Sequence, residues 1–553
     1  MPRPVASRSV LIVSALLAGS TLAVRALGTA AQSPAERMPG AVGNVAGHVP
    51  DQLEQAQTAP VEASRSKPVS DWWSPGEGRR MPPSITYANG LGQLGMLNTA
   101  APFETKGHPF FEAVGANGRA CVTCHQPANA MSVSAEAIQK RWQETKGKDP
   151  IFAAVDGKNC PDLPQDDPAS HSLLLKRGLF RIFLPWPPRA ADGKAIDPEF
   201  TIEVVRDPTG CNLSPVYGLR SANPMISVYR RPRVVANVKY LEHQKFGVGP
   251  FIGKNGLPSA RDPETGKPVA MNIMADAREP TLKTQAVEAA ITHLQFDGKL
   301  DAAALAKILA FERQVYTAQT SYHGAGSLID ADGPPAFGPA NLAREEEGVL
   351  GNNTTRFVFP MGDAWKVAKP GESAEQRAMR DSIRRGHDVF FYRTFWIRDS
   401  MHLNELGLGN PTKRTCATCH GMHMTGMDVA DGWMDIGTTN LPWAKDPPIS
   451  PWETEKPELP LFKISCKPGV PPHPFLGRVI LTHDPGRALI SGRCADVGAI
   501  TMQQWRGLSA RAPYFSNGSA RTLKDLVEYY DKRFDIRYTD REKEDLVNFL
   551  SVL

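Results

Sequence analysis

Two short cysteine motifs constrain this chain of 553 residues more than any other feature. Both have the spacing C-x-x-C-H, and each supplies two cysteines and one histidine: Cys121, Cys124 and His125 in the first, Cys416, Cys419 and His420 in the second. This spacing is typical of c-type haem attachment, in which both thiols bond to the haem vinyl groups and the histidine is the proximal iron ligand. The sequence therefore predicts two covalently attached haem c groups.

Two other interpretations of the motifs are a redox-active cysteine pair and half of a zinc site. A redox pair does not need the adjacent histidine that each motif carries, and no second C-x-x-C completes a zinc ligand set. Haem attachment is the better explanation, because two complete five-residue matches in one chain rarely arise by chance.

The first 31 residues have the features of a secretory signal peptide. Arg3 and Arg8 precede the apolar run at 10–17, and small residues follow up to Ala31. A basic start, a short apolar region and a small-residue cleavage site predict a signal peptide that is cut near Ala31. A membrane anchor is the alternative, although the apolar run is short for one. In both cases the body of the protein is expected to be periplasmic or secreted.

Four cysteines lie outside the motifs, two in each half of the chain: Cys160, Cys211, Cys466 and Cys494. Disulfides persist in oxidising compartments, so we predict the pairs Cys160–Cys211 and Cys466–Cys494. Four cysteines allow three pairings, and free buried thiols are a further alternative.

Helical signals dominate wherever a periodic pattern can be read. Capping boxes at 373–376 and 539–542 each predict the start of a helix, and the apolar spacing at 301–314 predicts another. Residues 201–205 alternate as a short strand does, and the proline density at 183–188 excludes a regular helix. We therefore predict a mainly α fold with two cytochrome c-like haem domains and long loop insertions.

The organisation expected after the signal peptide has four parts. Residues 32–80 are rich in Pro, Ala, Ser and Gln and form a linker or mobile arm. An N-terminal haem domain follows at 81–335, then an inter-domain linker at 336–370 and a C-terminal haem domain at 371–553. The net charge of +5 is slight for this length and no Lys/Arg block stands out, so nucleic acid is not expected as a partner.

The chain resembles the bacterial di-haem cytochrome c peroxidase superfamily, which includes MauG and the larger di-haem rubber oxygenases. In the C-terminal half, residues 506–515, 517–519 and 522–523 resemble the family segment "LRN-x-x-x-x-x-PYF-x-(D/N)G-x-x-x-TL". In the N-terminal half, residues 276–286 resemble "WDGR…SLEEQA", and residues 310–312 resemble the "AFE" helix.

The resemblance implies a distal ligand for the C-terminal haem. In the family the helix after "PYF…TL" supplies it, as Met in the peroxidases and Tyr in MauG, and that position is Tyr530 here. Tyr530 also falls on the apolar helix face formed by Leu523, Leu526 and Val527, so an ordinary core tyrosine is the alternative. Four methionines compete for the same role: Met422, Met424, Met427 and Met502.

The resemblance also implies that the N-terminal haem is the reactive one. The family's "EEQA" glutamine, which lies over that haem, corresponds to Gln285, and the family's distal Glu is replaced by Gln295. His293 follows Gln285 by two helical turns, so one helix face could present both side chains, with His293 as acid and base for bound peroxide. A structural histidine is the alternative. The family's bridging Trp corresponds to Ala275, which requires another electron route.

The resemblance implies an exported peroxidase-like oxidoreductase. Its N-terminal haem would activate peroxide or dioxygen, and its C-terminal haem would relay electrons from a small donor protein such as a cytochrome c or a cupredoxin. Alternatives are an oxygenase that cleaves an apolar substrate, MauG-like oxidation of a protein, and a pure electron-transfer cytochrome. The family's calcium site has no clear match, and we do not predict calcium.

Overall fold

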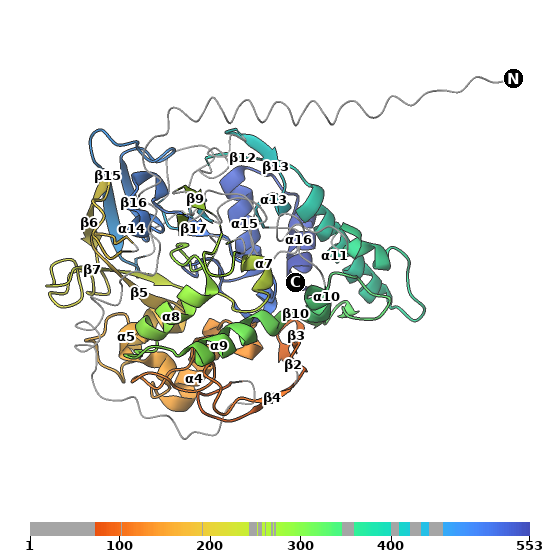
Figure 1. Cartoon of the computed structure of the whole chain (residues 1–553). Coiled ribbons are helices and arrows are strands. Elements are labelled where there is room, and N and C mark those ends of the chain that lie inside the picture. Colours follow the sequence, from red (N-terminus) through yellow and green to blue (C-terminus); the bar gives the residue numbers. More distant parts are fainter. Residues whose placement is uncertain are drawn as a thin grey trace. The chain divides into compact units, whose positions relative to one another are not determined.

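Helices and strands both contribute substantially to the fold (Figure 1). The computed structural model describes these residues: 72–100, 102–190, 192–242, 251–252, 257–259, 261–266, 269, 273–344, 359–399, 409–420, 433–441 and 457–553. Of these, 32% are helical and 20% are in strands, so the chain is mixed α/β and the prediction of a mainly α fold is wrong. The predicted signal peptide, the linker up to residue 71, and residues 345–358 of the inter-domain linker lie outside the described residues.

The helices are α3 (Cys121–Cys124), α4 (Ala135–Thr145), α5 (Ala154–Gly157), α6 (Ser172–Arg177), α7 (Lys239–Glu242), α8 (Leu282–Thr292), α9 (Ala302–Gln314), α10 (Gly338–Arg344), α11 (Ala374–Tyr392), α13 (Ala417–His420), α14 (Ala488–Ser491), α15 (Leu523–Phe534) and α16 (Asp540–Ser551). Two of the predicted helices begin at their predicted caps: Ser373 caps α11 through the amide of Gln376, and Thr539 caps α16 through that of Glu542. The helix predicted from apolar spacing at 301–314 is confirmed as α9, and the Asp301 side chain caps it through the amide of Ala304. Helices α11 and α16 pack together beside the C-terminal motif.

The strands are β1 (Arg80–Met81), β2 (Ser84–Asn89), β3 (Gly92–Asn98), β4 (Phe103–Glu104), β5 (Phe180–Pro185), β6 (Phe200–Arg206), β7 (Met225–Arg230), β8 (Phe251–Ile252), β9 (Pro258–Ser259), β10 (Val315–Tyr322), β11 (Gly326–Ser327), β12 (Phe395–Ile397), β13 (Thr412–Arg414), β14 (Trp433–Met434), β15 (Leu461–Cys466), β16 (Val479–Thr482) and β17 (Ile500–Thr501). They form small antiparallel sheets, the largest of which has the order β11-β10-β3-β2. The predicted strand at 201–205 is confirmed as β6, and no helix forms at 183–188.

A three-stranded sheet joins distant parts of the chain. Its order is β16-β15-β6, and Phe462 of β15 is paired with Val204 of β6. Strand β6 lies in the part predicted as the N-terminal haem domain, and β15 and β16 lie in the part predicted as the C-terminal one. The domain boundaries remain predictions, but any boundary must allow for this shared sheet.

Each cysteine motif belongs to its own hydrophobic cluster. Val122 is fully buried among Phe110, Phe111 and Phe311, whereas Ala417 and Cys419 belong to a larger cluster with residues of α11, α15 and α16. The cysteines outside the motifs confirm the predicted pairing. Cys160 is bonded to Cys211 and Cys466 to Cys494, with Cα–Cα distances of 5.2 and 5.8 Å.

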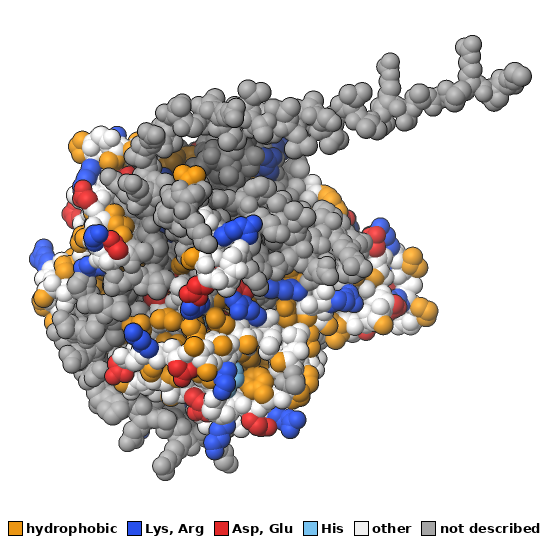
Figure 2. All heavy atoms as spheres, in the orientation of Figure 1, with side chains coloured by type: hydrophobic (Ala, Val, Ile, Leu, Met, Phe, Trp, Pro, Cys, Tyr) orange, Lys and Arg blue, Asp and Glu red, His pale blue; other side chains and the backbone are white. Residues whose placement is uncertain are grey.

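The charges on the face drawn in Figure 2 are mixed. Lys and Arg side chains alternate with Asp and Glu side chains, and apolar side chains lie between them. The small net positive charge is therefore not gathered into one patch on this face. Among the residues that the structure describes, no helix is both long enough and apolar enough to cross a membrane.

Candidate functional site

The N-terminal motif opens into a large cavity. Cys121 and Cys124 lie on the single turn α3, and His125 ends that turn. All three line a cavity with about 1430 Å³ of empty space, its mouth included. Much of its wall is apolar, formed by Val234, Val235, Val238, Leu282, Ala286, Ala289 and Ile308.

His125 is neutral and held in one orientation. Its Nδ1 lies 3.1 Å from the carbonyl oxygen of Met131, which can only accept, so Nδ1–H donates there and Nε2 is the nitrogen without a proton. Burial lowers the pKa of His125 to about 4, which keeps the imidazole neutral at pH 7. A backbone carbonyl therefore orients this ring before any group binds.

The motif cysteines differ from those of a redox-active pair. Burial raises the pKa of Cys124 to about 12 and that of Cys121 further, whereas redox C-x-x-C thiols have a lowered pKa. Neither thiol is in a disulfide, and the same is true of Cys416 and Cys419. Neutral, partly buried thiols beside a neutral histidine fit covalent attachment to an apolar group better than thiol–disulfide exchange.

The predicted distal residues lie in the same cavity as His125. Gln285 is on α8, and His293 is the first residue after the last turn of that helix, with backbone angles that are still helical. Both side chains line the cavity. Gln295, at the position of the family's glutamate, is not among the residues that line it; its Nε2 is buried without a hydrogen-bond partner.

An acidic partner of His293 was missed by the sequence analysis. The Nδ1 of His293 lies 2.6 Å from Oδ2 of Asp156, which is on α5. Burial alone would raise the pKa of Asp156, but the charge of Arg119 and the hydrogen bond with His293 lower it below its ordinary value. Asp156 is therefore a carboxylate that orients the imidazole. The two residues are 137 positions apart and share no motif, so no local signal could have identified the pair.

The backbone of His293 is fixed by two further side chains. Asn117 Nδ2 donates to the His293 carbonyl oxygen at 2.9 Å, and Arg119 Nη1 donates to it at 3.2 Å. Arg119 also forms a buried ion pair with Asp156. Arg119 and Asn117 lie just before the motif, so the chain that carries the thiols also positions the histidine that faces them.

At the C-terminal motif, His420 faces Tyr530. The motif helix α13 places His420 in the core, and its Nε2 lies 3.2 Å from the Tyr530 hydroxyl. Burial lowers the pKa of His420 to about 3 and raises the pKa of Tyr530 above its ordinary value. The predicted proximal and distal groups therefore point at each other. They must separate for an iron to be ligated by both.

Two smaller cavities lie at this contact. Both are lined by His420, Tyr530, Met502 and Trp505; one contains Cys416 and Cys419 and has about 540 Å³ of empty space, and the other has about 560 Å³. The Trp505 ring packs on His420 at a centroid distance of 4.1 Å. Of the competing methionines, Met502 reaches the site, while Met422, Met424 and Met427 lie outside the described residues. Tyr529 is turned away, since its hydroxyl donates to the carbonyl of Ile436 at 2.5 Å.

A short segment separates the cavities of the two halves. Met502, Gln503, Gln504 and Arg511 line both the large cavity and one of the smaller ones. Thr501 N donates to the carbonyl of Ala275 at 2.9 Å, so this segment runs against the loop that contains Ala275.

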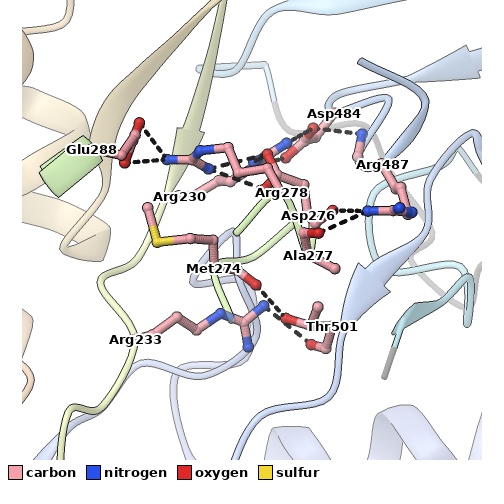
Figure 3. Close-up of polar contacts among 11 residues, drawn as sticks. Arg230, Arg233, Met274, Asp276, Ala277, Arg278, Glu288, Asp484, Arg487 and Thr501 are labelled. Carbon is pink, nitrogen blue, oxygen red and sulfur yellow. Dashed lines mark hydrogen bonds and ion pairs between the residues drawn. The ribbon is translucent and has the colours of Figure 1, made fainter. Parts of the chain in front are cut away.

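That loop is fixed by a buried network of ion pairs (Figure 3). Arg230 contacts Asp276 at 2.5 Å and Asp484 at 2.6 Å, while Arg278 contacts Asp276 at 3.0 Å and Glu288 on α8 at 3.2 Å. The network thereby ties the C-terminal half to the loop and to the helix that carries Gln285.

No protein-family model matches the chain, and no curated protein matches it either.

Proposed function

We propose that this protein is an exported di-haem c-type oxidoreductase with peroxidase-like activity. His125 and His420 would be the proximal ligands, and the four motif thiols would anchor the haems. The observation that supports this most directly is the large cavity, where both thiols and the neutral His125 meet the two predicted distal residues. Haem supplies a redox-active iron when it is bound; the residues around it decide what each site can do.

The two sites differ in what faces the proximal histidine. In the N-terminal cavity His293 and Gln285 are polar groups on a wall that is otherwise largely apolar, which suits a small oxidant such as peroxide or dioxygen. His293 would accept a proton from bound peroxide and return it to the departing oxygen, while Asp156 holds the ring in place. Gln285 would donate a hydrogen bond to the oxidant. At the C-terminal site Tyr530 occupies the distal side, which suits electron relay from a small donor protein.

One observation favours a second candidate, an oxygenase that acts on an apolar organic substrate. The walls of the cavity at His125 are rich in Val, Leu and Ile side chains, which an apolar substrate would contact. Turnover of peroxide with a reduced small cytochrome would favour the peroxidase. A pure electron-transfer cytochrome would bind no carbon monoxide when reduced, because both irons would carry two protein ligands.

The first prediction concerns haem content. The intact mass of the mature protein should exceed that of the polypeptide by two haems, because both motifs are complete. A Cys121→Ala/Cys124→Ala variant should lose one haem and keep the other, since the motifs lie in separate hydrophobic clusters. A single haem in the unmodified protein would contradict the proposal.

The second prediction concerns Tyr530. Tyrosinate is an anionic oxygen ligand that favours ferric iron, so Tyr530→Phe should raise the reduction potential of one haem and change its ferric absorption spectrum. Tyr529→Phe is the matched control, because that hydroxyl is bonded to a carbonyl and should leave both potentials unchanged. If neither variant changes a potential, Tyr530 is a core residue and Met502 becomes the better candidate for the ligand.

A further inference from the structure

The large cavity contains more buried positive charge than its own carboxylates balance. Seven ordinarily charged side chains line it: Asp156, Arg230, Arg231, Arg233, Arg278, Glu312 and Arg511. Arg230 and Arg278 are neutralised by the network of Figure 3, and Asp156 is paired with Arg119 and His293. Burial raises the pKa of Glu312 to about 8, so this side chain is mostly neutral at pH 7.

Three arginines of this cavity therefore remain without an acidic partner. Within the described part of the chain, no carboxylate lies within ion-pair distance of Arg231, Arg233 or Arg511. Burial lowers the pKa of Arg231 and Arg233 to about 9 and that of Arg511 to about 10, and all three are still charged at pH 7. Arginine is seldom buried without a partner of opposite charge, because an unpaired buried charge is costly.

Two of the three are held by backbone carbonyls. Arg231 donates to the carbonyls of Arg177 and Val133 at 2.9 and 2.6 Å, and Arg511 donates to that of Gln504. These bonds fix the guanidinium groups but do not neutralise them.

Arg233 differs, because much of its hydrogen-bonding capacity is unused. Only its Nη2 is bonded, to the carbonyl of Thr501 at 3.1 Å, while Nε and Nη1 are buried with no partner. Those two nitrogens carry three of the five N–H bonds of a guanidinium. Buried donors of this kind are almost always satisfied in a native protein, so their partner must belong to whatever fills the cavity.

We propose that Arg233, with Arg231 and Arg511 beside it, forms a carboxylate-binding site for the propionates of the haem attached at Cys121 and Cys124. This inference rests on the proposed function. It explains why one cavity combines an apolar wall, two thiols and uncompensated positive charge, since haem has an apolar body, two vinyl groups and two carboxylates. Arginine suits the role because its planar N–H groups match carboxylate geometry.

The test compares Arg233→Met with Arg233→Lys in the holoprotein. Removing a positive charge beside one haem favours ferric iron, so the Met variant should reduce the equilibrium constant for reduction of that haem about tenfold, or about 59 mV for one electron. The other haem should not change. The Lys variant keeps the charge and should recover most of the potential.

A second measurement detects the contact itself. The propionate bending mode in the resonance Raman spectrum reports hydrogen bonding to the carboxylates, and it should shift in Arg233→Met. If the potential changes but this mode does not, Arg233 acts only through its charge and the proposed contact is wrong. If neither changes, the carboxylate site is wrong, even where intact mass shows two haems and the proposed function stands. Should the Met variant fail to mature, Arg233→Gln, which keeps donors without charge, is measured in the same way.

Discussion

His293→Ala should slow the reaction with peroxide, or with dioxygen if the protein is an oxygenase, by about 10²–10⁴-fold, which is the usual contribution of a positioned acid–base group. The structural reason is that His293 is the one histidine besides His125 among the residues that line the large cavity. Its Nδ1 is already occupied by Asp156, which leaves Nε2 to exchange protons with the oxidant. Stopped-flow absorbance after mixing with peroxide measures the rate, and intact mass verifies that both haems remain.

Two further variants separate an acid–base role from a structural one. Asp156→Asn should slow the same step less than His293→Ala does, because an amide oxygen holds the Nδ1–H of the ring less firmly than a carboxylate does. His323→Ala, at an exposed histidine away from the cavities, should leave the rate unchanged. An unchanged rate in His293→Ala would contradict the assignment. So would carbon monoxide binding at the C-terminal haem alone, which would reverse the roles of the two halves.

Arg230→Met should lower the free energy of unfolding by about 3–5 kcal/mol, the usual cost of removing one partner from a buried ion pair. Arg230 is 2% exposed and Asp484 is 4% exposed, and Arg230 donates to Asp484 at 2.6 and 2.9 Å. Without it, Asp276 keeps Arg278, but Asp484 becomes a buried carboxylate with no ion pair among the described residues. Urea unfolding followed by circular dichroism measures the change.

The same network provides controls for that experiment. Asp484→Asn removes the carboxylate charge that Arg230→Met leaves unpaired. The double variant Arg230→Met/Asp484→Asn should therefore be more stable than Arg230→Met alone. Arg313→Met breaks the ion pair between Arg313 and Glu242, in which the Arg313 side chain is 48% exposed. This variant should lower the free energy of unfolding by only about 0–1 kcal/mol. If Arg230→Met and Arg313→Met cost the same, the buried network contributes little to stability.

The predictions that succeeded rest on local chemistry. The caps of α11 and α16 bond to amides three residues away, so a short stretch of sequence carries the whole signal. The apolar spacing that predicts α9 is local as well. The motif cysteines and histidines are also close together in the sequence, and haem attachment at them stays a prediction. The disulfide prediction rests on the position of the four cysteines outside the motifs, two in each half of the chain, and not on geometry. The structure has the same pairing.

The predictions that failed depend on distant partners. Strand β10 contains Ala, Gln and Ser and lacks a clear alternation, and it becomes a strand because β3 and β11 pair with it. Strand β5 follows a short helix, and its partner β7 comes some forty residues later. Such pairing leaves little trace in a single sequence, which is why the strand content was missed. The Asp156–His293 contact was missed for the same reason.

The sheet shared by β6 and β15 has a consequence for the order in which the chain can fold. The ribosome synthesises strand β6 long before its partner β15, because Glu203 on β6 and its neighbour Lys463 on β15 are separated by 260 residues. Strand β6 therefore cannot form its backbone pairing with β15 until most of the remaining chain has been synthesised. Until β15 arrives, β6 has a free edge of backbone donors and acceptors that can pair with another chain. Chains that end before residue 461 keep that edge permanently, and during synthesis every molecule passes through the same aggregation-prone stage.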